Sequence, residues 1–131
     1  MLYLQTGTNS ITTTLSEKST LANPYYTWEI IRKGSFESIF FYNDDNSPNP
    51  EYYNTFTFSL GTFSNPQYGY LDANEGEYTY NVYQKSSPNS ITISSSDALV
   101  ETGIMIITTT YSIINSYTAS DNNTIIYYNN L

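Results

Sequence analysis

The sequence contains no cysteine and no histidine. The absence of cysteine excludes a disulfide framework and a thiol nucleophile, and the absence of histidine removes the most common general base of enzymes. Acidic pairs such as Asp44/Asp45 and Glu75/Glu77 could in principle hydrolyse a glycoside, but close-set acids of this kind are typical of solvated turns. We therefore expect no catalytic residue and no enzymatic activity.

Positive charge is equally scarce, because four basic residues stand against twelve acidic ones and the net charge is −8. The basic residues are Lys18, Arg32, Lys33 and Lys85. Four bases cannot neutralise a run of phosphates, so we expect no nucleic-acid partner and no attraction to an anionic membrane surface. The chain starts without the basic stretch and apolar run of a signal peptide, and no apolar run approaches the roughly 18 residues that span a bilayer. These features predict a soluble protein made in the cytosol.

Two segments carry the hard oxygen ligands that Ca²⁺ prefers, namely Asp44-Asp45-Asn46 and Asp121-Asn122-Asn123. Neither has the spacing of an EF-hand loop, and turns rich in Asp and Asn form equally well without a metal. We therefore expect neither a metal ion nor a cofactor.

Aromatic residues are abundant, with 15 Tyr, 6 Phe and 1 Trp. Helical periodicity is almost absent, and short runs of alternating polarity are separated by Pro, Gly, Asn and Asp clusters. This pattern predicts an all-β protein, a single antiparallel β-sandwich of about seven to nine strands that occupies residues 1–131 as one domain. We expect strands near residues 2–6, 11–15, 25–33, 37–42, 53–60, 77–84, 98–109, 111–117 and 124–128.

Alternation also predicts the core, because every second residue of a strand faces the same side of the sheet. The side chains expected to face inward are those of Trp28, Phe56, Phe58, Tyr78, Tyr80 and Val82. Residues 103–107 are apolar on both faces, which predicts a strand that is covered on both sides.

The most specific segment comprises residues 74–82, Asn-Glu-Gly-Glu-Tyr-Thr-Tyr-Asn-Val. It resembles the start of strand F in immunoglobulin domains, where Asp-Glu-Gly-x-Tyr-x-Cys is common. The resemblance implies a turn at Gly76, a tyrosine corner in which the Tyr78 hydroxyl bonds to upstream backbone, and Tyr80 in the position of the cysteine. Trp28 lies upstream at a distance suited to the core tryptophan of strand C. Strand B stays open for residues 25–33, and another antiparallel sandwich stays open for the topology.

Nearly the whole chain is similar to small virion proteins of tailed bacteriophages, including crAss-like and marine phages. The suggestive pairing joins Gly-Glu-Tyr-Thr-Tyr-Asn-Val-Tyr of residues 76–83 to Leu-Val-Glu-Thr-Gly of residues 99–103. The resemblance implies a structural protein of the virion, made in the host cytoplasm, that coats or reinforces the capsid as an auxiliary (decoration) protein. Its partners would be other virion proteins, above all the major capsid protein, and further copies of itself. A head-fibre or tail component is the alternative.

Some tyrosines must be exposed, since Tyr52-Tyr53, Tyr68, Tyr70 and Tyr127-Tyr128 cannot all lie inside. Tyrosine is enriched at protein interfaces, which favours binding to proteins. Exposed tyrosines also stack on sugars, so a carbohydrate-binding adhesion module is the alternative.

The terminal segments are the predicted docking elements. Residues 2–15 carry no charged side chain, and residues 125–128 are apolar on both faces. An edge strand of that kind invites aggregation unless a partner covers it or the same sheet pairs it. The candidate docking residues are Leu2, Leu4, Ile125, Ile126, Tyr127 and Tyr128.

Overall fold

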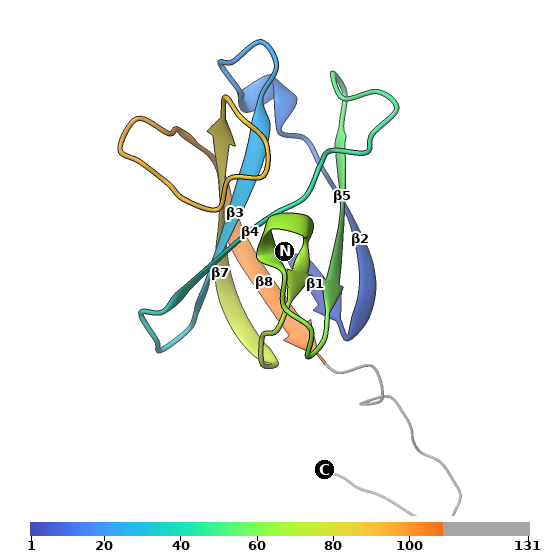
Figure 1. Ribbon diagram of the computed structural model, residues 1–131, viewed down its shortest axis with the longest axis vertical. Helices are drawn as coiled ribbons and strands as arrows, with labels where there is room; N and C mark the ends of the chain where they lie inside the picture. Colours follow the sequence, from blue (N-terminus) through green and yellow to red (C-terminus); the bar gives the residue numbers. More distant parts are fainter. Residues whose placement is uncertain (109–131) are drawn as a thin grey trace, which may run out of the picture.

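The computed structural model describes residues 1–108, which form two β-sheets that face each other across a buried core (Figure 1). The larger sheet has the order β1 (Leu2–Gln5), β8 (Leu99–Thr108), β7 (Gly76–Lys85), β3 (Tyr25–Arg32) and β4 (Ser38–Tyr42). The smaller sheet has the order β2 (Gly7–Thr13), β5 (Asn54–Leu60) and β6 (Tyr70–Leu71). Within this range the helical segments are short 3₁₀ turns, η1 (Ser16–Lys18) and η2 (Pro66–Tyr68).

The all-β prediction is confirmed, but the purely antiparallel one is wrong, because β1 pairs with β8 in parallel and β5 pairs with β6 in parallel. The first parallel pair arises at Gly7, whose φ of 104° lies in a region that residues with a Cβ rarely adopt. The chain bends there, so that β1 belongs to the larger sheet and β2 to the smaller one. Alternating sequence predicts strands but not the sheet that each strand joins.

Each strand expected within residues 1–108 has an observed counterpart, with boundaries that differ by a few residues. The two-residue strand β6 was not predicted, because so short a segment has no readable period. The strands expected at residues 111–117 and 124–128 lie outside the described residues.

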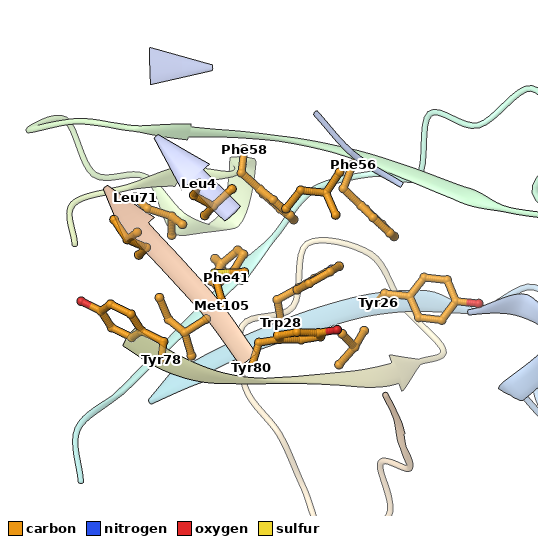
Figure 2. Packing of buried hydrophobic residues seen from close by; sticks show 14 of the residues in the cluster. Leu4, Tyr26, Trp28, Phe41, Phe56, Phe58, Leu71, Tyr78, Tyr80 and Met105 are labelled. Carbon is orange, nitrogen blue, oxygen red and sulfur yellow. The ribbon is translucent and has the colours of Figure 1, made fainter. Parts of the chain in front are cut away.

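Trp28 is fully buried at the centre of the core, and its neighbours are aromatic (Figure 2). Phe56 and Phe58 of β5 meet it edge to face, each with ring centroids 5.4 Å away, and Tyr80 of β7 stacks on it at 5.7 Å. Phe41 of β4 stacks on Trp28 at 6.1 Å. Edge-to-face and offset geometries are those that aromatic pairs prefer, so these rings join the two sheets without a disulfide.

The structure places six of the predicted core side chains in one buried cluster, namely Trp28, Phe56, Phe58, Tyr78, Tyr80 and Val82. Gly76 is half-buried at the start of β7. The Tyr78 hydroxyl donates a hydrogen bond to the backbone carbonyl of Asn74 at 2.7 Å and so fastens the turn that precedes β7. Burial raises the pKa of Tyr78 above its ordinary value.

The prediction that residues 103–107 are covered on both sides is wrong. Met105 and Ile107 face the core, whereas Ile104, on the opposite face of β8, is 40% exposed. The strand with both faces covered is β3, in which residues 26–30 are all buried. Both strands are interior. The difference arises because Ser90 of the connection between β7 and β8 bonds to Thr27, while Ser38, Asn81 and Tyr83 bond to Glu29 on the outer face of β3.

The connection between β7 and β8, residues 86–98, folds back over one end of the larger sheet. Thr27 of β3 donates from Oγ1 to the carbonyl oxygen of Ser90 at 2.6 Å. At the base of the connection, Lys85 and Asp97 form a mostly buried ion pair of 2.7 Å. This connection covers part of the outer face of the larger sheet and leaves the rest to solvent.

Candidate docking surface

The uncovered part of the outer face of the larger sheet mixes apolar side chains with polar ones such as Asn81 and Thr102. The strand register places Ile31, Thr79 and Ile104 side by side on β3, β7 and β8. The neighbouring row contains Ile106 of β8 beside Tyr3 of β1. We call the following residues the sheet face: Tyr3, Ile31, Phe40, Thr79, Ile104 and Ile106.

Two members of the sheet face are strongly exposed, since Tyr3 is 64% and Ile104 is 40% accessible to solvent. The other apolar members, Ile31, Phe40 and Ile106, are half-buried by their neighbours. At the margin, Glu77 pairs with Lys33 at 3.6 Å in an exposed ion pair of the kind that contributes about 0–1 kcal/mol. The surface is therefore partly apolar, with one exposed ion pair beside Ile106.

Glu29 lies on the same side of the sheet as Phe40 and is only 9% exposed. Ser38 Oγ donates to Glu29 Oε2 at 2.8 Å. Asn81 Nδ2 and Tyr83 Oη donate to Oε1 at 3.1 and 3.2 Å. Thr102 Oγ1 in turn donates to Asn81 Oδ1 at 2.8 Å, so one hydrogen-bonded network crosses four strands, β4, β3, β7 and β8.

The charge of Glu29 is balanced by neutral donors, because no basic residue among those described forms an ion pair with it. Burial is the main cause of the raised pKa of Tyr83, and the nearby negative charge of Glu29 raises it further. The network fixes the position of the Glu29 side chain. A partner that covers this carboxylate is favoured if it places a hydrogen-bond donor or a cation against it.

The predicted docking residues fall in three different places. Leu4 is completely buried in the core, so its assignment to a docking surface is wrong. Leu2 is half-buried and packs against the core. Alternation along β1 turns these leucines inward and Tyr3, which was not predicted, toward solvent. Ile125, Ile126, Tyr127 and Tyr128 lie outside the described residues.

A second feature is a groove of about 610 Å³ lined mainly by residues 21–26 and 42–51. Its floor includes the buried Tyr26 and Tyr42, and Tyr25 lies at its rim with 37% of its surface exposed. No basic residue lines it, whereas Asp44, Asp45 and Glu51 do. A neutral or cationic group suits such a groove better than an anion.

The two aspartates of the groove are already engaged. Tyr42 donates from its hydroxyl to Asp44 Oδ1 at 2.8 Å, and burial, followed by this hydrogen bond, raises the pKa of Tyr42. Asp45 Oδ1 accepts the backbone amides of Ser47 and Thr55, and its Oδ2 accepts Nδ2 of Asn54. In the described part of the chain, His, Cys, Asp and Glu side chains do not gather in groups of three or more that could hold a metal ion.

The remaining exposed aromatic residues are scattered. Phe36 projects from the turn between β3 and β4, and Tyr52 lies in the loop before β5. Phe63 and Tyr70 contact each other edge to face with centroids 5.3 Å apart, and Tyr68 lies nearby in η2. Phe63, Tyr68 and Tyr70 therefore lie close to one another, whereas Phe36 and Tyr52 lie on other connections.

Among residues 1–108, no helix has the length and apolar character needed to cross a bilayer. No family model matches the chain, and neither a curated protein nor a solved structure matches it at a significant level.

Proposed function

We propose that this chain is a non-enzymatic structural protein that binds other proteins through the sheet face. The observation that carries the proposal is the uncovered outer face of the larger sheet, where the exposed side chains of Tyr3 and Ile104 share one surface with the buried carboxylate of Glu29. Apolar patches of this kind on an otherwise polar surface mark sites of protein association, and the buried centres of interfaces are poor in charge.

The chemistry of Glu29 also describes the partner. A purely apolar surface placed over Glu29 would remove the last water from a carboxylate that has no cation, which is costly. A partner that offers Lys or Arg at this point avoids that cost, and a net charge of −8 attracts a basic surface from a distance. The proposed partner surface is therefore apolar with a basic residue near its centre.

We further propose that the fold is an immunoglobulin-like β-sandwich, and three features support this. The strand with Trp28 pairs with the strand that starts at Gly76, as strand C pairs with strand F. The hydroxyl of Tyr78 bonds to backbone upstream of its strand, as in a tyrosine corner. The pairing of β2 with β5 is antiparallel, as that of strands B and E is. On this reading β3 is strand C.

The particular role that we propose is that of an auxiliary protein on the capsid shell of a tailed bacteriophage, bound to the major capsid protein. The sequence resemblance over residues 76–83 and 99–103 supports this role. A head-fibre or tail component is the alternative within the virion. Mass spectrometry of purified virions tests the proposal, since an auxiliary shell protein is present in many copies. Absence of the chain from the particles would refute it.

Binding through the sheet face is tested with Ile104→Asp, which adds a charge to the exposed apolar row. We expect at least about a tenfold loss of affinity for particles that lack the chain, because the charge would be buried on binding. The matched control is Tyr52→Asp, since Tyr52 is 75% exposed and lies in the loop before β5, a strand of the smaller sheet. Equal binding of the two variants would show that the partner contacts another surface.

A carbohydrate-binding role is the second candidate, and the groove favours it because tyrosine rings and carboxylates line it. Against it, Tyr26 and Tyr42 are buried, so that only Tyr25 offers a ring for stacking. Screening on a glycan array decides between the two roles. A bound glycan that Tyr25→Ala releases would replace protein binding as the conclusion.

A further inference from the structure

The two sheets have four edge strands in the described part of the chain, and three of them are protected. β1 is four residues long and β6 is two residues long, so neither offers much backbone to an incoming strand. β4 lies against η2. β2 differs, because its seven residues carry no charge, no proline and no bulge, and it forms the margin of the smaller sheet (Figure 1). Natural proteins seldom leave such an edge open.

The hydrogen bonds of β5 show which backbone groups of β2 face outward. Ser59 donates its amide to Gly69, on the side away from β2, and the carbonyl of Thr55 accepts the amide of Asn46. Alternate residues of an antiparallel strand point to opposite edges, so residues 54, 56, 58 and 60 bond to β2. The β2 partners of those residues are 13, 11, 9 and 7.

The amides and carbonyls of Thr8, Ser10 and Thr12 therefore point to the free edge. Among the described residues none of these groups has a hydrogen-bond partner outside the strand ladder, and all three residues are exposed. Their spacing is symmetric about Ser10. An edge of this kind is complementary to a second copy of itself that runs in the opposite direction.

We propose that β2 pairs with β2 of a second copy of this chain about a twofold axis at Ser10. Ser10 faces Ser10 of the second copy, and Thr8 faces Thr12, so that each of these pairs exchanges two backbone hydrogen bonds. The smaller sheets of the two copies then form one continuous sheet. This contact does not depend on the phage role.

The side chains at this edge fit a copy better than they fit a charged partner. Thr8, Ser10 and Thr12 lie opposite Ser59, Thr57 and Thr55 of β5, so that hydroxyl groups line the outer face of both strands. Threonine and serine make favourable cross-strand pairs, and no like charges meet across the axis. Repulsion between two chains of net charge −8 acts at longer range, so added salt should strengthen the dimer.

The test measures the mass of the full chain by analytical ultracentrifugation over a range of concentrations. We expect a dimer that becomes tighter in higher salt. Ser10→Pro removes one outward amide and no bond to β5, which an edge position tolerates, and it should weaken the dimer at least about tenfold. Ser10→Lys places like charges at the axis and should act in the same way.

The matched control is Thr57→Lys, which puts the same charge on the same face of the sheet but one strand away from the edge. This variant changes the net charge by the same amount as Ser10→Lys, and it should still dimerise because its lysine is not at the edge. A wild-type chain that stays monomeric up to about millimolar concentration would overturn the proposal. A dimer that tolerates both substitutions of Ser10 would overturn it as well. If Ser10→Pro does not fold, as judged by circular dichroism, Ser10→Lys decides the question.

Discussion

Replacing Trp28 with alanine tests how the core is held together. The indole is fully buried and packs against four aromatic rings, those of Phe41, Phe56, Phe58 and Tyr80. Truncation of a buried aromatic residue to alanine costs about 3–5 kcal/mol. One feature reduces this cost, because Trp28 Nε1 is buried without a hydrogen-bond partner among the described residues. An unsatisfied donor costs about 1–3 kcal/mol, and the substitution removes it.

We therefore expect Trp28→Ala to lower the free energy of unfolding by about 3 kcal/mol, near the lower limit for such changes. Trp28→Phe keeps a ring and also removes the unsatisfied donor, so it should cost only about 1–2 kcal/mol. A small domain is stable by about 5–15 kcal/mol, so the alanine variant should still fold in the cold. A larger loss of stability in Trp28→Ala than in Trp28→Phe would identify ring packing as the main contribution of Trp28 to stability.

The assay is urea unfolding followed by far-ultraviolet circular dichroism, because both variants lack the tryptophan that fluorescence would report. Phe36→Ala is the control, since a side chain that is 101% exposed should change stability by less than about 0.5 kcal/mol. If Trp28→Ala unfolds at the same urea concentration as the wild type, the indole is not at the centre of the core. A phenylalanine variant as unstable as the alanine variant would show that the smaller ring recovers none of the packing of the indole.

Three further substitutions have expected outcomes that unfolding experiments can check. Tyr78→Phe removes one hydrogen bond and leaves the ring in place, so it should cost about 1 kcal/mol in urea unfolding. Gly103→Ala would put a Cβ 2.7 Å from the Tyr80 ring, so it should lower the free energy of unfolding by about 1–3 kcal/mol. Adding Tyr80→Leu to the same chain removes the ring and should reduce the loss that Gly103→Ala causes. The hydrogen bond from Lys85 is the main reason that the pKa of Asp97 lies below its ordinary value. The ion pair therefore stabilises the fold above about pH 4 and loses its effect as the pH falls through the lowered pKa, so Asp97→Asn should lower the melting temperature at pH 7 and have a progressively smaller effect as the pH is lowered below 4.

The strands that sequence predicted best are those with strict alternation of large aromatic and polar residues. In β5 the phenylalanines Phe56 and Phe58 alternate with threonine and serine, and the structure turns them to the core. In β8 the same reasoning was wrong, because Ile104 is apolar and yet faces outward. A period of two gives the faces of a strand, but a strand that is apolar at every position has no period to read.

The network at Glu29 was not predicted at all. Its members are separated by up to 73 positions in the sequence, since Glu29 and Thr102 belong to β3 and β8. Only the strand register brings Asn81 between them, and register follows from the whole sheet and not from any local pattern. The one available signal was a charged residue placed directly between Trp28 and Ile30.

The two proposed contacts use opposite sides of the molecule. The sheet face is the outer surface of the larger sheet, whereas β2 lies at the margin of the smaller sheet, which covers the other side of the core. A dimer joined at β2 therefore keeps both of its sheet faces free. On a repetitive surface such as a capsid shell, binding of one sheet face of the dimer holds the second sheet face near the next binding site. The second face therefore binds at a high effective concentration, and the dimer attaches more tightly than a monomer would. A modest apolar patch is then sufficient for stable attachment, provided that the spacing of the two faces matches the repeat of the shell.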